Sequence, residues 1–435
     1  MLMEMKHITA IDIGTTKTVV LIAQIKESGQ IEILGIGTST SKGIKKGVVK
    51  NVEETVNSIE EAIEMATKNY DYELNNIFVG VTSHQIKTIF NKGSRYIENK
   101  NNEISADDVR LLIDEMNKIS IGLDEEILEI IPQAYIIDGD PEESNPIGIT
   151  ANRLEADFKI ITNKQISKIG IEKSLNRINL KYNQVFLNPV ASAASVLSPD
   201  EIEAGVVLVD IGAGVTDVAI FYDNIVRHIA VIPFGGNVVT RDIKEGCQIL
   251  LRDAELLKIQ FGSAIGDGAP EDKVVSIAGI NGRKPKEISF KSLAYIIQAR
   301  IEEIAEQVAF EIEKSKYFDI IGAGIVVTGG GALLRNLDEL LAFKTGMEVR
   351  IGIPFEDKFE NLDIELQKPE FSTALGILIE ASDYEDSLQA IKKAKDQTKP
   401  AIQNSDNDVE PDGKNVDNGG VLGFFKNLLT DKNMQ

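Results

Sequence analysis

A short segment near the N-terminus gathers residue types that bind phosphate. Asp12-Ile13-Gly14-Thr15-Thr16-Lys17-Thr18 follows the largely apolar residues 8–11. Glycine lets backbone N–H groups approach an anion, the threonine hydroxyls donate further hydrogen bonds, and Lys17 adds positive charge. A hairpin turn alone would explain the glycine and the aspartate, but not the hydroxyls and the lysine together. The segment is therefore a candidate phosphate-binding turn.

The same pattern returns later in the chain. Residues 210–217, Asp-Ile-Gly-Ala-Gly-Val-Thr-Asp, align with the first segment so that Asp12 matches Asp210, Gly14 matches Gly212 and Thr18 matches Thr216. Each copy has an apolar strand, an Asp-x-Gly turn and a second apolar strand, which predicts a β-hairpin. Such a duplication predicts two similar lobes that face one another. The candidate phosphate-binding residues are Gly14, Thr15, Thr16, Lys17, Gly212, Ala213, Gly214 and Thr216.

The two matched aspartates predict a metal ion. Asp12 and Asp210 would repel a phosphate directly, but they can hold a hydrated Mg²⁺ that bridges phosphates, because this ion keeps several of its waters. We therefore expect two turns that close on one nucleotide from opposite lobes, with Asp12 and Asp210 bound to Mg²⁺ through water. The chain has no GxxxxGK[ST] motif, so a Walker-type loop does not supply the phosphate site.

Two further segments fit such a cleft. Gly329-Gly330-Gly331 follows an apolar strand at 325–328 and precedes an apparently helical stretch at 333–341. Bare backbone of this kind lets an adenine or ribose lie against it, near a helix N-terminus that favours phosphate, although a flexible loop is the alternative. Glu255 and Lys258 lie one turn apart on a predicted helix, where a solvated surface pair would be the ordinary interpretation.

Composition narrows the class of protein. The 435 residues allow two or more domains, and 43% of them are hydrophobic. A net charge of -22 argues against nucleic acid as a partner. The single cysteine, Cys247, cannot form an intramolecular disulfide, which together with the absence of a recognisable secretory signal predicts a reducing cytosol. One cysteine and three histidines also make a structural zinc site improbable.

Together these motifs resemble the actin and heat-shock ATPase superfamily and, within it, the bacterial cell-division FtsA family. The resemblance covers nearly the whole chain. Asp-x-Gly turns are shared by sugar kinases and many relatives, whereas residues 41–63 and the last residues are much more similar to FtsA alone. Further matching segments are residues 188–197, 233–243 and 254–264.

The resemblance implies roles for individual residues. Glu255 and Lys258 would flank the adenine of ATP, Gly329 to Gly331 would lie on its ribose side, and Gly235-Gly236 would lie at the nucleotide's other edge. Arg300, in the segment Arg-Ile-Glu-Glu, would contact an acidic peptide from FtsZ, although an ordinary ion pair on a helix surface is the alternative.

One position departs from the family pattern. Asn188 stands where the family usually has a glutamate before Pro189, at the place that positions the attacking water in relatives that hydrolyse ATP. An amide can orient water but cannot accept its proton. We therefore expect Asn188 and Asp210 at the catalytic position to give slow ATP hydrolysis at best, so that the chain's status as an enzyme stays open. The alternative is an asparagine that only begins a turn before proline.

We expect an α/β, actin-like (ribonuclease H-like) two-lobed ATPase fold with an inserted subdomain. The insert has predicted strands around 85–90, 129–138 and 154–162 and a helix start at Ser105, with a capping acid at Asp108. The expected parts are a first lobe of residues 1–83 with 167–203 and 370–385, an inserted small α+β subdomain of residues 84–166, a second lobe of residues 204–240 with 305–369, and an adenine-side subdomain of residues 241–304.

The C-terminal residues change character twice. Residues 396–420 hold six acids against two lysines and almost no apolar residues, which predicts a disordered linker. Residues 421–435 then begin with apolar side chains at helical spacing, which predicts an amphipathic helix that binds a membrane surface, rather than one that docks back on the protein. Its membrane-binding residues are Val421, Leu422, Phe424, Phe425, Leu428 and Leu429. No apolar run is long enough to span a bilayer.

The resemblance implies a peripheral membrane protein of bacterial division. It would bind ATP and Mg²⁺, polymerise on the cytoplasmic face of the cell membrane at the division site, tether the FtsZ ring through the FtsZ C-terminal peptide, and recruit later division proteins. A pilus-assembly ATPase similar to PilM, which shares the insert, and a sugar kinase of the same fold are the alternatives. A kinase has no use for a lipid anchor, so residues 421–435 favour the division protein over the kinase.

Overall fold

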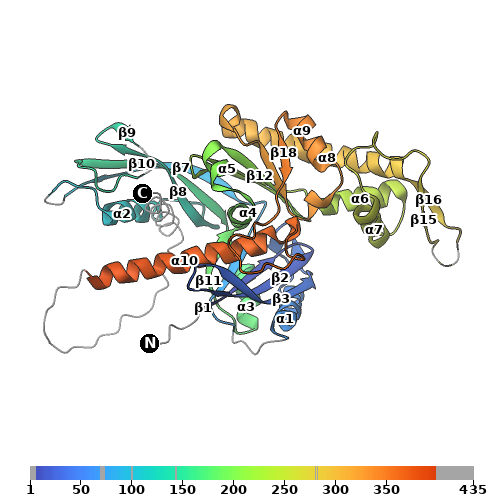
Figure 1. The fold of residues 1–435 in the computed structure, drawn as a ribbon, viewed down its shortest axis with the longest axis horizontal. Coiled ribbons are helices and arrows are strands. Elements are labelled where there is room, and N and C mark those ends of the chain that lie inside the picture. Colours follow the sequence, from blue (N-terminus) through green and yellow to red (C-terminus); the bar gives the residue numbers. More distant parts are fainter. Residues whose placement is uncertain are drawn as a thin grey trace. The chain divides into compact units, whose positions relative to one another are not determined.

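The computed structural model describes residues 6–68, 74–98, 101–142, 145–279, 281 and 283–397, with residues 390–397 described by their backbone alone. The described residues within Met1–Lys87 and Asn163–Glu380 form one compact unit, here called the core unit. Those within Thr88–Thr162 and Ala381–Gln435 form a second, the inserted unit. Figure 1 shows the helices and strands of each.

The first sheet of the core unit has the strand order β11-β6-β1-β2-β3. Its β1–β2 hairpin is antiparallel and runs on into β3, whereas β6 and β11 are parallel to β1. The bounds are β1 (Lys6–Ile13), β2 (Lys17–Ile25), β3 (Ile31–Thr40), β6 (Ile77–Val81) and β11 (Tyr182–Leu187). The associated elements are β4 (Ile44–Lys45), β5 (Val48–Val49), α1 (Val52–Thr67), α3 (Gln165–Arg177), α4 (Asn188–Val196) and α5 (Pro199–Ala204).

The second sheet repeats this topology in the order β14-β13-β12-β17-β18. The hairpin β12–β13 continues into antiparallel β14, and β17 and β18 run parallel to β12. The predicted duplication is therefore confirmed and extends from one hairpin to five strands. The bounds are β12 (Val206–Ile211), β13 (Thr216–Tyr222), β14 (Ile225–Ile232), β17 (Ile325–Thr328) and β18 (Val349–Ile351).

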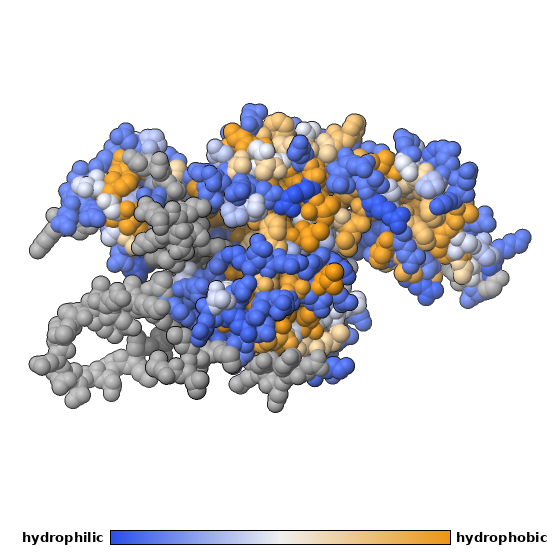
Figure 2. Space-filling model, viewed as in Figure 1, coloured by the Kyte–Doolittle hydropathy of each residue, from blue (hydrophilic) through white to orange (hydrophobic). Residues whose placement is uncertain are grey.

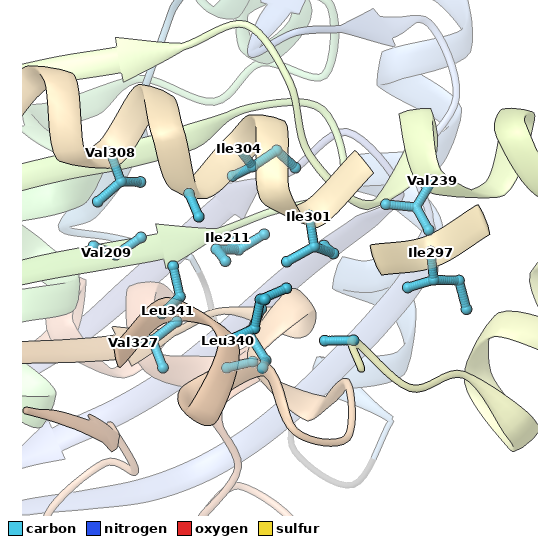
Figure 3. Packing of buried hydrophobic residues seen from close by; sticks show 14 of the residues in the cluster. Val209, Ile211, Val239, Ile297, Ile301, Ile304, Val308, Val327, Leu340 and Leu341 are labelled. Atoms are coloured by element: carbon cyan, nitrogen blue, oxygen red, sulfur yellow. The ribbon is translucent and has the colours of Figure 1, made fainter. Parts of the chain in front are cut away.

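Helix α8 (Phe290–Ser315) anchors the second sheet through one large apolar cluster. Figure 3 shows Ile304 and Val308 of α8 pointing toward Val209 and Ile211 of β12. Because each fully buried aliphatic side chain stabilises the fold by about 1.5–3 kcal/mol, this packing fixes the end of β12 from which the second turn projects. The same cluster includes Val327 of β17 and Leu340 and Leu341 of α9 (Leu337–Thr345).

The second half of the core unit also carries a helical segment with a small hairpin. It consists of α6 (Gly236–Cys247), α7 (Leu251–Phe261), β15 (Val274–Ile277), β16 (Lys286–Ser289) and the first part of α8. Figure 2 shows hydrophobic surface on this part of the visible face between hydrophilic patches. The exposed apolar residues here include Leu251, Leu256, Ile259, Val274 and Tyr295.

One predicted helix begins later than the sequence indicated. Residues 333–341 were expected to be helical, but Gly330–Leu333 form a 3-10 turn and α9 starts at Leu337. Asn336 has a left-handed backbone (φ 56°), which α-helical geometry does not allow. The glycine run is therefore separated from α9 by an irregular turn. Further 3-10 turns lie at Phe318–Ile320 and at Pro369–Phe371, the latter labelled η4.

The inserted unit has a four-stranded sheet in the order β7-β10-β8-β9. The predicted capping box is confirmed, because Ser105 accepts a hydrogen bond from the Asp108 N–H and the Asp108 side chain accepts one from the Ser105 N–H. Val109, Leu112 and Ile113 of the helix are buried in the core of this unit. The bounds are β7 (Lys87–Tyr96), α2 (Ala106–Met116), β8 (Glu125–Ile137), β9 (Asp140–Glu142) and β10 (Arg153–Lys164).

Helix α10 (Ser372–Gln397) changes the expected start of the C-terminal linker. Asp396 and Gln397 were expected in a disordered segment from residue 396, but both are helical. The rest of the predicted linker, to residue 420, and the predicted membrane-binding helix at 421–435 lie outside the described residues. Within the part of the chain that the structure describes, no helix is both long and apolar enough to cross a bilayer.

Candidate functional site

The first turn projects from the end of the β1–β2 hairpin. The Gly14 N–H donates to the Lys17 carbonyl at 3.1 Å, which closes a tight turn over Thr15 and Thr16. Thr18 is the second residue of the return strand β2 and is fully buried, with its hydroxyl 2.6 Å from the Ser41 hydroxyl. Gly14, Thr15, Thr16 and Lys17 keep exposed surface, so the four predicted phosphate-binding residues of the first turn are accessible.

The second turn has the same backbone closure at the end of β12. Here the Gly212 N–H donates to the Val215 carbonyl at 3.0 Å, as Gly14 does in the first turn. Thr216, the match of Thr18, is buried and donates to the Phe234 carbonyl at 2.9 Å. The matched threonines therefore stabilise their turns, and the residues of the second turn that keep exposed surface are Gly212, Ala213 and Gly214.

The two turns lie against one another. A Cβ at Gly214 would collide with the Thr15 side chain, so only glycine allows this close approach of the second turn to the first. The structure thus brings together residues that are far apart in sequence and come from the two repeated hairpins. This contact places both predicted phosphate turns at one position in the core unit.

The start of α6 joins the second turn. The Gly236 N–H donates to the Gly212 carbonyl at 2.9 Å and the Asn237 N–H donates to the Ala213 carbonyl at 2.8 Å. Gly235 is the N-cap residue of α6. Because the positive end of a helix dipole favours negative charge, the N-terminus of α6 adds to the anion-binding character of this turn.

Glu255 and Lys258 of α7 face the start of α6. The Lys258 ammonium lies 2.8 Å from the Glu255 carboxylate, 3.2 Å from the Gly236 carbonyl and 2.9 Å from the Thr240 hydroxyl. Glu255 also accepts from the Thr240 hydroxyl. The two residues are therefore not a solvated surface pair but a polar cluster beside Gly235 and Gly236.

The three glycines after β17 lie over the end of β12. Gly329 has a φ of 80°, and a Cβ at this position would collide with the Asp210 carboxylate. The Gly329 N–H donates to the Pro369 carbonyl at 3.2 Å. A side chain at Gly330 would meet no atom within 4 Å, so the backbone there is open on one side.

Three aspartates cluster beneath these loops. The pKa of Asp12 is raised to about 7, chiefly by burial and also by the charge of Asp210, while Lys17 acts in the opposite direction. The pKa of Asp210 is also raised by burial, against the hydrogen bonds that it accepts from Ser192 at 2.7 Å and Thr373 at 3.2 Å. Asp12 keeps some exposed surface, whereas Asp210 is only 6% exposed. The negative charge of these aspartates is thus only partly offset by Lys17.

The third aspartate, Asp217, is a site residue that the sequence interpretation did not single out. It pairs with Asp210 across the hairpin, is 4% exposed, and accepts a 2.6 Å hydrogen bond from the Thr82 hydroxyl. Burial raises its pKa strongly, and Asp210 and Asp12 add to the effect. The available signal was an acid immediately before the apolar residues 218–221, at the position where the first copy has Val19.

Asn188 lies beside Gly80 of strand β6. It is the first residue of α4 and 8% exposed, and its Oδ1 atom packs against the bare backbone of Gly80. Among the described residues, this buried oxygen has no hydrogen-bond partner. The N-cap of α4 is Leu187, so the Asn188 side chain does not cap the helix that it begins. A purely turn-forming role leaves the buried amide oxygen unexplained.

The donor set fits a hydrated divalent cation. Burial raises the pKa of all three carboxylates, and the charge of Asp210 adds to the effect at Asp12 and Asp217; a positive ion among them would lower these pKa values. Magnesium prefers carboxylate oxygens and binds through one or two of them while keeping waters. Within the described residues, no three His, Cys, Asp or Glu side chains are arranged to hold a metal directly.

Arg300 lies on α8 and contacts a different set of residues. Its guanidinium forms two hydrogen bonds with Asp242 of α6, at 2.6 and 3.3 Å, and one with Glu303 at 2.5 Å. Its side chain is 23% exposed. The arginine is thus already paired in the free chain. The predicted membrane-binding residues 421–429 lie outside the described residues.

The chain matches a known family in its sequence. Residues 207–376 match the family described as "Cell division protein FtsA", and residues 83–162 match the "SHS2 domain inserted in FTSA". The cell division protein FtsA of Pseudomonas aeruginosa is 36% identical over 374 residues, which cover 86% of this chain and 89% of that protein. The Escherichia coli protein is 32% identical over 380 residues, covering 86% and 90%.

Solved structures share the fold at low sequence identity. The PilM-PilN type IV pilus biogenesis complex matches with a TM-score of 0.60 and 16% identity, covering 86% of this chain and 98% of that one. MreB5 of Spiroplasma citri bound to ADP matches with a TM-score of 0.51 and 15% identity, covering 90% and 98%. These likenesses establish the actin-like fold alone. The FtsA relatives are at least 30% identical over most of both chains, and this chain therefore belongs to the cell-division protein FtsA family.

Proposed function

We propose that this division protein binds ATP at the paired turns and polymerises on the cytoplasmic membrane face, where it tethers FtsZ. The observation that carries the nucleotide site is the direct contact of two equivalent Asp-x-Gly turns, at Thr15 and Gly214. The MreB5 protein of the same fold has been solved with ADP and with AMPPNP. A titration of the full chain with MgATP tests the proposal, and the absence of binding would overturn it.

Each loop of the site has a distinct task toward the nucleotide. The hydroxyls of Thr15 and Thr16, the Lys17 ammonium and the N–H groups of Ala213 and Gly214 would bind the phosphates, whereas the Gly212 N–H closes its own turn. Glu255 and Lys258 would flank the adenine, beside Gly235 and Gly236. The open backbone at Gly329 to Gly331 would lie along the ribose.

Asp12 and Asp210 would hold Mg²⁺ through its waters. When bound, the ion would neutralise phosphate charge that otherwise meets the carboxylates. Asp217 would add a third negative charge to this environment, held in place by Thr82. Ser192 and Thr373 hydrogen-bond to one oxygen of Asp210, which fixes the orientation of that carboxylate.

Asn188 would orient a water near the phosphates but accept no proton from it. Replacing Asn188 with glutamate should therefore raise the rate of ATP hydrolysis, by about 10²–10⁴-fold if a general base is all that is missing. ATP affinity should change little, because the residue contacts water rather than nucleotide. Single-turnover phosphate release measures the rate, and Asn183→Glu, on β11, serves as a surface control. An unchanged rate would leave Asn188 without a role in hydrolysis.

Arg300 would bind an acidic group of the FtsZ C-terminal peptide on the face formed by α6 and α8. Because Asp242 already occupies the guanidinium, the peptide must compete with it. Arg300→Gln should weaken peptide binding by about 30-fold or more if the arginine is a hot spot worth 2 kcal/mol. Asp242→Asn should strengthen it, since it frees the guanidinium.

Fluorescence anisotropy of a labelled peptide measures both variants. Arg335→Gln is the matched control, because Arg335 is a second arginine of the same unit that hydrogen-bonds the Gln260 carbonyl. Equal affinity in wild type, Arg300→Gln and Asp242→Asn would place the FtsZ peptide on another surface.

The apolar residues 421–429 would attach the protein to lipid as a peripheral membrane protein. Assembly into a filament would gather many such segments on one surface, where they act together. The filament would hold the FtsZ ring at the division site and present a platform for later division proteins. No nucleic acid is expected among the partners, because the net charge is -22.

A further inference from the structure

The segment that begins α10 contacts three separate parts of the proposed nucleotide site. Glu370 meets Lys17 of the first turn, Thr373 donates to Asp210 at 3.2 Å, and the Pro369 carbonyl accepts from the Gly329 N–H at 3.2 Å. We call residues 369–373 the α10 start. It comprises η4 and the first two residues of α10. None of the roles assigned above uses Glu370.

Lys17 is held by the α10 start from two sides. Its ammonium lies 3.1 Å from the Glu370 carbonyl and 3.7 Å from the Glu370 carboxylate. It also sits 3.7 Å from the centre of the Phe371 ring, a cation–π arrangement. The side chains of Lys17 and Glu370 are 29% and 34% exposed, so both remain open to a ligand.

The rest of the α10 start is tightly fixed. Ser372 is fully buried, with its hydroxyl 2.6 Å from that of Thr328, and its carbonyl accepts from Ser195 at 2.8 Å. Thr328 in turn is the last residue of β17, immediately before the glycine run. The neighbours of Glu370 therefore contact Thr328, Gly329 and Asp210 directly. A displacement of Glu370 is transmitted to these residues without a flexible loop in between.

We propose that Glu370 is a positioning residue that competes with a nucleotide phosphate for Lys17, so that phosphate occupancy is transmitted to the start of α10. The proposal rests on the proposed nucleotide site. A phosphate that approaches Lys17 offers more negative charge than one carboxylate, and it draws the ammonium away from Glu370. The chain must then break the Glu370–Lys17 contact when it binds nucleotide. The free energy of that contact therefore lowers the affinity for nucleotide. By thermodynamic linkage, any ligand or partner that displaces the α10 start also changes the affinity for nucleotide.

Binding measurements separate this role from a purely structural one. Glu370→Gln keeps the backbone carbonyl but removes the competing charge, so we expect ATP to bind about three- to tenfold more tightly than to the wild type. Adenosine, which has no phosphate, should bind both proteins equally. Glu360→Gln is the matched control, because Glu360 makes a similar ion pair with Lys26 at 3.6 Å. Adding Lys17→Met should cancel the effect of Glu370→Gln.

Hydrogen exchange gives a readout independent of affinity. In the wild type, saturating ATP should change the exchange of amides 370–376, whereas Glu370→Gln should show the ATP-bound pattern before ATP is added. Suppose that the wild type binds ATP, that Glu370→Gln binds it with the same affinity, and that exchange at 370–376 does not change. This result would overturn the inference and leave the proposed function intact. Failure of the wild type to bind ATP would overturn both.

Discussion

Replacing Asp210 with asparagine is expected to lower the affinity for MgATP by about 10- to 100-fold, the range found when a residue that orients a metal's ligands is changed. Asparagine keeps an oxygen that can accept from Ser192 and Thr373, so the fold around the site should survive. The affinity for metal-free ATP should stay the same or rise. The reason is that the variant removes one of the buried charges that repel phosphate.

Isothermal titration with ATP, in the presence of Mg²⁺ and of EDTA, measures both affinities. Asp319→Asn is the control, because it makes the same change on the exposed 3-10 turn at 318–320 of the same unit. The expected pattern is a loss for Asp210→Asn confined to the Mg²⁺ series. Equal losses with and without Mg²⁺ would show that Asp210 contacts the nucleotide and not the metal's water shell.

Phe424→Glu is expected to abolish binding of the full chain to liposomes. Burying the six apolar side chains of residues 421–429 contributes roughly 9–18 kcal/mol, at about 1.5–3 kcal/mol each. Ordering those nine residues costs about 1–2 kcal/mol each, a similar sum. The net free energy of binding one tail to the membrane is therefore near zero, and the negative charge of the protein adds repulsion from anionic lipid. The cost of burying a single charge in lipid is therefore enough to make binding unfavourable.

Co-sedimentation with liposomes tests this balance, with Thr430→Glu as the control. On the predicted helix, residue 430 lies opposite the apolar stripe, so the same charge there should be tolerated. Because several tails on one filament bind together, wild-type binding should rise more steeply than linearly with protein concentration and increase with ATP. A strictly linear dependence, equal with and without ATP, would show that single chains bind the membrane unaided.

The sequence by itself determined the repeated hairpins and the inserted unit. Asp12 and Asp210, each followed by Ile-Gly between two apolar runs, specify a turn through local residue types, and the structure closes both turns in the same way. The capping box at Ser105 and Asp108 was readable for the same reason, since its partners are three residues apart. Signals of this kind survive because neighbouring residues alone satisfy the backbone hydrogen bonds involved.

Only the tertiary structure decided which side chains meet across the core unit. Lys17 and Glu370 are separated by 353 positions, and Thr82 and Asp217 by 135, so no local periodicity links either pair. Asp217 is one acid in a largely apolar strand of the sequence. Arg300 was predicted to contact an acidic peptide, with a helix-surface ion pair as the alternative, and only the fold brings Asp242 opposite it. The packing of the two repeated sheets against α8 and α10 decides these partners. A buried charge needs a partner, and only the folded chain determines which groups lie close enough to serve.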